Sequence, residues 1–185
     1  RDVAPSRGLG DVYKRQIESS LYYREGASIN NFSSCLPASQ SSLAQELTKD
    51  PYNFDFLTLR DGYLERELED ALTDNITKFL IELGNGFAYV GRQVRLEVGG
   101  DEFFIDLLFY HLKLRSYVVI ELKTGDFQPE YIGKLGFYVS AINHEMKLPQ
   151  DNPTIGLLIC KSKNNIVARY TLDTANLPSV SLNMN

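Results

Sequence analysis

Two carboxylates and a lysine stand out because they interrupt or end apolar runs. Asp106 interrupts the run FFIDLLF, and Glu121, 15 residues later, and Lys123 close the run VVIELK. Burying a carboxylate among such residues costs several kcal/mol unless a cation compensates it. A tight hairpin centred near Lys113 and Leu114 would place Asp106 and Glu121 opposite each other, where like charges repel. A divalent metal ion held between the two carboxylates would remove this conflict.

Simpler explanations exist for each of these residues. Glu121 and Lys123 are two positions apart in a predicted strand, so they project from the same face and could form a solvated ion pair worth at most about 1 kcal/mol. Asp106 could lie in a turn, or it could be an edge-strand charge that prevents aggregation. The six apolar neighbours of Asp106, with no Gly or Pro among them, favour the metal site.

The elements that must position these residues follow from apolar periodicity. Leu64 to Leu83 carries apolar residues at three- and four-residue steps, which predicts an amphipathic helix ending at Gly84. The next segments predict an antiparallel meander, with Gly99-Gly100-Asp101 as its first turn. Its three strands are expected at about Ala88–Val98, Glu102–Tyr110 and Tyr117–Lys123.

A second helix and further strands complete the predicted domain. The helix is expected at 129–143 with a proline at its first position, and Gly133 and Gly136 suggest that it packs closely on the sheet. The run 154–160 suits a buried parallel strand, and 166–172 is predicted as another strand. The order α-β-β-β-α-β indicates an α/β domain with a central mixed sheet flanked by helices.

Composition narrows the function further. The chain has 185 residues, of which 43% are hydrophobic, and it contains neither a long apolar stretch nor a signal peptide, so a cytoplasmic protein without membrane contact is expected. Cys35, Cys160, His111 and His144 lack the spacing of a zinc site, which leaves oxygen ligands. The net charge of −5 weighs mildly against a nucleic-acid partner.

Local strings in the chain resemble a known nuclease family. Asp106 and the triplet ELK at 121–123, on consecutive predicted strands, resemble the PD-(D/E)XK nuclease superfamily. Within it, FAYVGRQ at 87–93, FIDLLFYH at 104–111 and VIELKTG at 119–125 are similar to the bacterial YhcG-type family. The resemblance covers about residues 50–175 and implies a restriction-endonuclease-like core, equivalent to the C-terminal nuclease domain of that family.

The resemblance also implies an activity. It implies a Mg²⁺- or Mn²⁺-dependent endonuclease that hydrolyses phosphodiester bonds in DNA, in genome defence or DNA processing, as a homodimer and with partner proteins of a defence or restriction system. An RNA nuclease would use the same metal chemistry. A non-catalytic DNA-binding or protein-interaction module on the same fold is the alternative from another class.

Each candidate residue receives a role. Asp106 and Glu121 suit the metal, and the ammonium of Lys123 suits the attacking water. The superfamily places a third acid on the first helix, and Glu69 is the choice because it lies on the apolar face. The alternative is that Glu69 and the neighbouring acids only complement the dipole of the helix N-terminus. Both readings remain open for Glu69.

Other polar residues are expected near the same site. The resemblance implies that Tyr131 and Lys134 of the second helix lie near the active site or the DNA backbone, although tyrosines at helical spacing are usually core residues and a single lysine is usually solvated. Arg92, Gln93 and Arg95 precede the proposed site on a strand, where phosphate contacts and ordinary surface roles are equally plausible.

The chain divides into four segments on this reading. Residues 1–16 are expected to be disordered or extraneous, and 17–60 to be a linker and lead-in with a short helix near residues 42–48. The nuclease domain is expected at 61–175 and a tail at 176–185.

Overall fold

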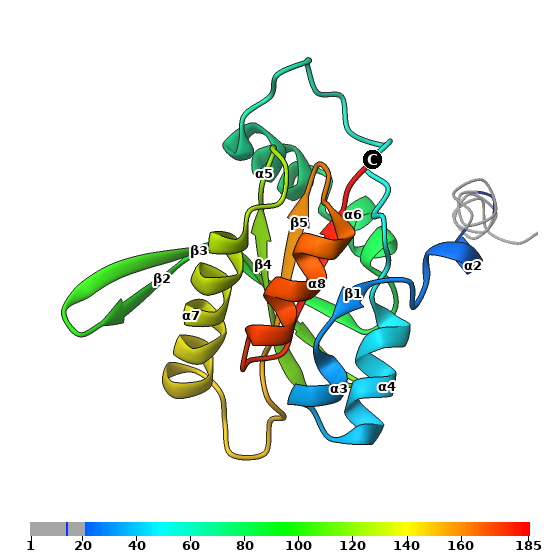
Figure 1. The fold of residues 1–185 in the computed structure, drawn as a ribbon. Coiled ribbons are helices and arrows are strands. Elements are labelled where there is room, and N and C mark those ends of the chain that lie inside the picture. Colours follow the sequence, from blue (N-terminus) through cyan, green and yellow to red (C-terminus); the bar gives the residue numbers. More distant parts are fainter. Residues whose placement is uncertain (1–13, 15–20) are drawn as a thin grey trace, which may run out of the picture.

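A mixed β-sheet forms the centre of the molecule (Figure 1). The computed structural model describes Lys14 and residues 21–185, so the rest of the predicted extraneous segment 1–16 lies outside the described residues. Within them the strand order is β1-β6-β5-β4-β3-β2. The strands are β1 (Ile29–Asn30), β2 (Phe87–Val98), β3 (Asp101–His111), β4 (Ser116–Leu122), β5 (Ile155–Cys160) and β6 (Ser179–Asn183).

Helices cover both faces of this sheet, which confirms the predicted α/β class (Figure 1). The helices are α2 (Leu21–Arg24), α3 (Phe32–Cys35), α4 (Ala38–Leu47), α5 (Glu65–Asp74), α6 (Ile76–Leu83), α7 (Pro129–Glu145) and α8 (Asn165–Thr174). No helix in the described part of the chain is long and apolar enough to cross a membrane.

The antiparallel meander forms as predicted. Val98 pairs with Asp101 across Gly99 and Gly100, whose φ angles of 63° and 90° require glycine-like freedom. The β3–β4 ladder runs from His111 paired with Ser116 to Leu107 paired with Ile120, so its turn is centred where the sequence predicts it. β4 and β5 are parallel, as are β5 and β6, while β1 is antiparallel to β6.

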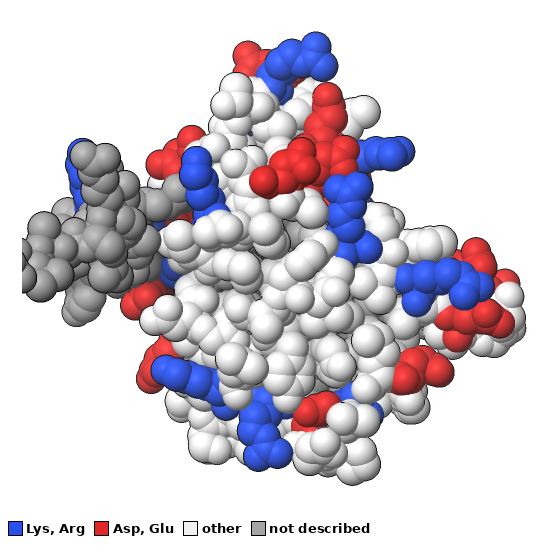
Figure 2. All heavy atoms as spheres, turned by 180° about the vertical axis from the view of Figure 1, so that it is seen from behind, with Lys and Arg blue, Asp and Glu red and all other residues white. Residues whose placement is uncertain are grey.

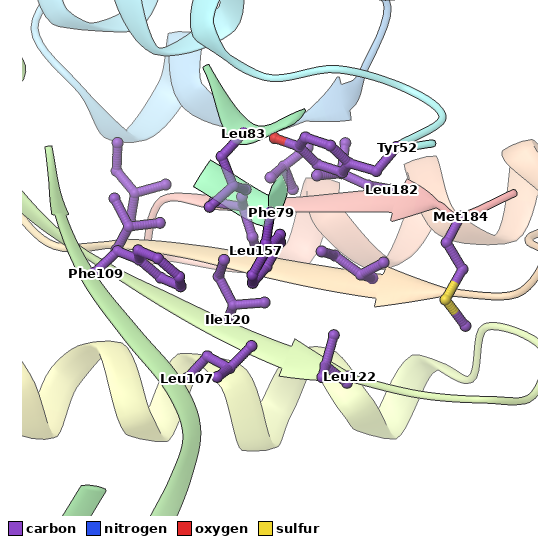
Figure 3. Close-up of a cluster of buried hydrophobic side chains, with 14 of the residues drawn as sticks. Tyr52, Phe79, Leu83, Leu107, Phe109, Ile120, Leu122, Leu157, Leu182 and Met184 are labelled. Carbon is purple, nitrogen blue, oxygen red and sulfur yellow. The ribbon is translucent and has the colours of Figure 1, made fainter. Parts of the chain in front are cut away.

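Two apolar cores sandwich the sheet. The first lies under α3, α4, α6 and the segment after α4, where Tyr52 is fully buried. Figure 3 shows Tyr52, Phe79 and Phe109 gathered with aliphatic side chains of the strands in this core. The second core packs α7 and α8 on the other face. Both faces of β4 and β5 are therefore buried, as their continuous apolar runs indicate.

The predicted helix from Leu64 to Leu83 is present but interrupted. Asn75 adopts φ −109° and ψ 37°, and its side-chain amide donates to the Ala71 carbonyl oxygen at 2.9 Å. This bend separates α5 from α6, which ends at Gly84 with φ 110°, as predicted. α5 therefore packs as a separate helix from α6 and contacts β4.

The predicted strand at 166–172 is wrong, because these residues belong to α8. The side-chain oxygen of Asn164 accepts hydrogen bonds from the backbone N–H groups of Ile166 and Val167 at 3.0 and 3.2 Å, which starts a helix. Ala168 and Leu172 are buried one helical turn apart, and Ile166 stays exposed. The β-branched pair at the start of the segment gave a misleading strand signal.

The predicted tail at 176–185 is not a tail. Ser179–Asn183 form β6, which lies between β5 and β1, and Val180 and Leu182 are fully buried. β1 also precedes the predicted domain start, so two strands of the sheet lie outside the range 61–175. Both segments are short and contain few apolar residues, so sequence periodicity alone gives them little weight.

Close packing between helix and sheet depends on a glycine in the strand. The sequence suggests that Gly133 and Gly136 of α7 allow this packing, but a Cβ on Gly133 would meet no atom within 4 Å. A Cβ on Gly156 of β5 would instead lie 2.7 Å from Leu135 Cγ and 2.9 Å from Val139 Cγ2. The close approach therefore belongs to β5.

Candidate active site

The candidate site lies where β3 leaves β4. The backbone ladder ends at Leu107 and Ile120, and at the next position side chains replace backbone partners. The backbone N–H of Leu122 donates to Asp106 Oδ2 at 3.0 Å, and the backbone N–H of Asp106 donates to Glu121 Oε1 at 3.3 Å. Each carboxylate thus binds the strand that carries the other one, and the predicted opposition of Asp106 and Glu121 is confirmed.

Glu121 is buried with one oxygen unsatisfied. Its residue is 2% exposed, and among the described residues Oε2 has no hydrogen-bond partner. Burial raises the pKa of Glu121 well above its ordinary value, and the neighbouring charge of Asp106 raises it further. A buried carboxylate of this kind is costly for the fold, so a compensating cation is the natural physical explanation for it.

Glu69 of α5 reaches the same place, as the apolar-face argument predicts. It is 5% exposed, and its Oε2 accepts a hydrogen bond of 2.7 Å from Gln93 Nε2. The same amide nitrogen lies 3.4 Å from Asp106 Oδ1. Burial raises the pKa of Glu69, the Gln93 hydrogen bond partly offsets this, and Asp106 adds to the increase. Gln93 therefore connects the helix carboxylate with the strand carboxylate.

Lys123 is held at the edge of the site by two neighbours. Its Nζ lies 3.9 Å from Glu65 Oε2 and 4.9 Å from the centre of the Tyr131 ring. The Glu65 carboxylate also accepts a long hydrogen bond of 3.5 Å from the backbone N–H of Thr124. The Lys123 side chain is 17% exposed, so its ammonium is confined between an acid and an aromatic face rather than free in solvent.

Lys134 approaches the pair from α7. Its Nζ lies 3.8 Å from Glu121 Oε2 and 5.5 Å from the centre of the Tyr138 ring. Burial lowers the pKa of Lys134, but the nearby groups Glu121, Tyr138 and Asp106 together raise it above its ordinary value. The lysine is therefore charged and faces the buried oxygen of Glu121, while half of its side chain remains exposed.

A hollow of about 340 Å³ opens beside these carboxylates. Arg92 lies on its wall, where it pairs with Asp70 at 2.7 Å, whereas Arg95 pairs with Glu97 and Glu102 on the β2–β3 hairpin. Figure 2 shows acidic side chains near the top of the molecule, where Figure 1 places α5, with basic side chains beside them. The hollow is lined by Glu65, Arg66, Glu69, Asp70, Arg92, Gln93 and Asp106.

Two of the three candidate carboxylates, rather than all three, are placed to bind a hard divalent cation. Within Lys14 and residues 21–185, no group of three or more His, Cys, Asp or Glu residues is arranged to hold a metal ion. Asp106 and Glu121 nevertheless lie side by side, since the Asp106 backbone N–H donates to Glu121 Oε1. Glu121 Oε2 is a buried acceptor with no hydrogen bond, although the Lys134 ammonium lies 3.8 Å away. Carboxylate oxygens are the ligands that Mg²⁺ prefers. Glu69 joins the pair only through Gln93.

Two contributors were underestimated from the sequence. The turn at Gly99 and Gly100 sets the β2–β3 register and places Gln93 opposite Asp106, so counting back from this turn could have identified Gln93. Glu65 lies four residues before Glu69 on α5 and therefore shares its face. Glu65 was considered only as a partner of the helix dipole, and it contacts Lys123 instead.

Comparison with known proteins identifies the family of the chain. A family model described as "YhcG PDDEXK nuclease domain" matches residues 45–182. The chain belongs to the YhcG PDDEXK nuclease domain family. A curated relative named "Putative nuclease YhcG", from Escherichia coli (strain K12), is 38% identical over 173 residues, which cover 91% of this chain and 45% of the relative. The chain thus spans less than half the length of that relative.

Two solved structures of endonucleases show more distant similarity to this family member. A repair endonuclease from Pyrococcus abyssi gives a TM-score of 0.43 at 17% identity, over 69% of this chain and 48% of that chain. The structure of an EndoMS–dsDNA2 complex gives a TM-score of 0.45 at 19% identity, over 68% of this chain and 49% of that chain.

Proposed function

We propose that this YhcG PDDEXK domain is a Mg²⁺-dependent endonuclease that hydrolyses phosphodiester bonds in DNA. The observation that supports it most is the reciprocal arrangement of Asp106 and Glu121, with a buried Glu121 oxygen that has no hydrogen bond and faces the Lys134 ammonium at 3.8 Å. Family membership supports the same reaction class. Asp106 and Glu121 would hold Mg²⁺ or Mn²⁺, and Glu69 would contribute through its link to Asp106.

Each side chain at the site has a distinct role in the proposed hydrolysis. A bound Mg²⁺ makes water a stronger acid and stabilises the negative charge that develops on the phosphate. Lys123, held by Tyr131 and Glu65, orients the attacking water by hydrogen bonding. Lys134 faces the pair from α7 with an exposed ammonium that can contact a phosphate of the substrate backbone. Water adds to phosphorus and gives up a proton, the ester P–O bond on the leaving side breaks, and the leaving oxygen takes up a proton. The products are one phosphate end and one hydroxyl end.

The decisive test combines cleavage with ion binding. We expect wild-type protein to cut supercoiled or linear DNA when Mg²⁺ is added, and its melting temperature to rise with Mg²⁺, because an ion bound only by the folded state stabilises it. Asp106→Asn should abolish both effects while it keeps an acceptor for Leu122 N–H. Asp101→Asn, an exposed change of the same type on β3, is the matched control and should leave both effects intact.

The same assay distinguishes the alternatives. RNA is included as a second substrate, because the hydrolytic chemistry is shared and only the treatment of the 2′-hydroxyl differs. Cleavage of RNA but not DNA would show that the substrate is RNA and not DNA as proposed. Equal cutting by wild type and Lys123→Ala would mean that another site or a contaminant is responsible. DNA binding without cleavage and without a Mg²⁺ effect would identify a non-catalytic module.

A further inference from the structure

Gln93 stands between two candidate ligands that come from different elements. It lies opposite Asp106 in the β2–β3 ladder, between the pairs Arg92–Leu107 and Val94–Ile105. Its Nε2 donates to Glu69 Oε2 at 2.7 Å and lies 3.4 Å from Asp106 Oδ1. A primary amide carries two N–H donors on one nitrogen, so a single side chain can serve both carboxylates.

The backbone of Gln93 is held in an unfavourable conformation. Its φ is 44°, and in the described part of the chain Arg115 is the other non-glycine residue with a positive φ, at 53°. A side chain in this left-handed region is strained, and such strain persists only where the surroundings fix it, which is frequent at functional sites. At Gln93 the conformation accompanies a side chain that reaches across to α5.

We propose that Gln93 is a positioning residue that fixes Glu69 of α5 against Asp106 and so completes the cation site. The inference rests on the proposed function and goes beyond it, because it assigns a role to a residue outside the acid and lysine set. Its physical basis is that two carboxylates repel each other unless donors lie between them. The Gln93 amide supplies these donors, and it also ties a helix to the sheet at the site.

The proposal predicts how Gln93→Gly should fold and how it should bind Mg²⁺. Glycine tolerates the positive φ, so the variant should still fold when EDTA is present. Its melting temperature should lie at or somewhat below that of wild type, because the amide no longer separates the two carboxylates. Glu69 would lose its donor and its fixed position. We therefore expect the dissociation constant for Mg²⁺ to rise about 10-fold or more, as is typical when a partner that orients a metal ligand is removed.

The experiment is a titration of MgCl₂ into the whole chain, followed by calorimetry and by the melting temperature. Arg115→Gly is the matched control, because it relieves the same backbone strain in the β3–β4 turn, away from the site. It should keep the wild-type affinity for Mg²⁺. In cleavage assays, Gln93→Gly should require more Mg²⁺ for half-maximal rate but recover most of its rate at saturating Mg²⁺.

A double-mutant cycle tests whether Gln93 acts through Glu69. Glu69→Gln alone should weaken Mg²⁺ binding, and adding Gln93→Gly to it should weaken binding little further, because the residue to be positioned is already altered. Fully additive losses would overturn the positioning role and would indicate that Gln93 contacts the ion directly.

The failure of this inference can be separated from that of the proposed function. If wild type responds to Mg²⁺, Asp106→Asn does not, and Gln93→Gly responds like wild type, then the role of Gln93 is wrong and the nuclease site stands. If wild-type protein shows neither Mg²⁺ binding nor cleavage, both proposals are overturned. Unfolding of Gln93→Gly in EDTA would show that Gln93 supports the fold rather than the site, and would overturn the positioning role.

Discussion

At the scale of single residues, two buried glutamates show opposite electrostatic situations. Glu121 is 2% exposed and lies beside the like charge of Asp106, which the half-exposed Lys134 at 3.8 Å only partly offsets. Glu82 is 3% exposed and pairs with Arg24. Glu82 Oε1 also accepts a 2.7 Å hydrogen bond from the backbone N–H of Asn53. The buried charge of Glu121 destabilises the fold, whereas the buried charge of Glu82 is stabilised by its partners.

This contrast predicts stability changes of opposite sign. Glu121→Gln should stabilise the protein in EDTA at neutral pH, because burial and Asp106 raise the pKa of Glu121 and each unit of displacement corresponds to about 1.4 kcal/mol. The stabilisation by Mg²⁺ should disappear. Glu82→Gln should instead destabilise by about 3–5 kcal/mol, because it removes the negative charge from the buried ion pair with Arg24. Urea unfolding of both variants measures the difference.

A loss of stability in Glu121→Gln without Mg²⁺ would contradict the strain assigned to the site. Such trade-offs are expected where a site holds charge that the fold alone does not need. The acid inside FFIDLLF can be recognised without coordinates, but Asp106 is only half-buried, and the buried acid is Glu121. The role of Gln93 depends on a left-handed backbone angle, which cannot be predicted from the residue type.

At the scale of elements, the contact between α7 and the sheet depends on one strand glycine. Leu135 and Val139 fill the space above Gly156 at distances that a Cβ could not tolerate, with the nearest contact at 2.7 Å. α7 carries Tyr131 and Lys134 toward the site, so the seating of this helix also determines how these side chains approach Glu121.

Gly156→Ala should therefore destabilise the protein by about 1–3 kcal/mol, the usual cost of overpacking a filled core. Gly133→Ala is the matched control on α7. Its Cβ would meet no neighbour within 4 Å, and alanine favours helix over glycine, so it should stabilise by up to about 1 kcal/mol. Denaturant unfolding gives both values. If Gly133→Ala were destabilised, the close packing would depend on the glycines of α7 rather than on Gly156.

The elements also show where sequence patterns succeed and fail. Long runs with a clear period, such as β3 and α7, are predicted within a few residues. α8 was missed because the side chain of Asn164 starts a helix that the β-branched Ile166 and Val167 do not suggest. The break between α5 and α6 likewise depends on the conformation of one residue, Asn75.

At the scale of the whole molecule, stability should depend on pH through His111. This residue is fully buried in β3, its Nδ1 accepts a hydrogen bond from Leu114 N–H at 3.2 Å, and its Nε2 lies 3.1 Å from the Asn85 carbonyl oxygen. Burial lowers the pKa of His111, and the nearby Lys113 adds to this. A proton on Nδ1 would also remove the hydrogen bond from Leu114.

Because the pKa is lower in the folded state, the neutral form is favoured there. Stability should be complete above about pH 6.5 and should fall as the pH passes down through the folded pKa, by at most about 1.4 kcal/mol per pH unit from this group. Melting temperatures of wild type, His111→Gln and the exposed control His144→Gln between about pH 8 and pH 5 measure this. An equal slope in wild type and His111→Gln would contradict the prediction.

The sequence predicts the order of the helices and strands better than it predicts the boundaries of the domain. The α-β-β-β-α-β order follows from local patterns, and the comparison with the YhcG PDDEXK nuclease domain covers residues 45–182, wider than the predicted 61–175. β1 and β6 pair over two residues and depend on partners far away in the chain. Such long-range pairing has no local signature, which is why 176–185 was assigned as a tail.

The exchange of partners at the point where β3 and β4 separate has a practical consequence. The amide proton of Leu122 belongs to the backbone of a sheet, yet it binds the Asp106 carboxylate. Its NMR resonance and its rate of deuterium uptake should therefore respond when that carboxylate changes its charge or its ligand. This one main-chain proton would then report whether the candidate site is occupied, without any turnover.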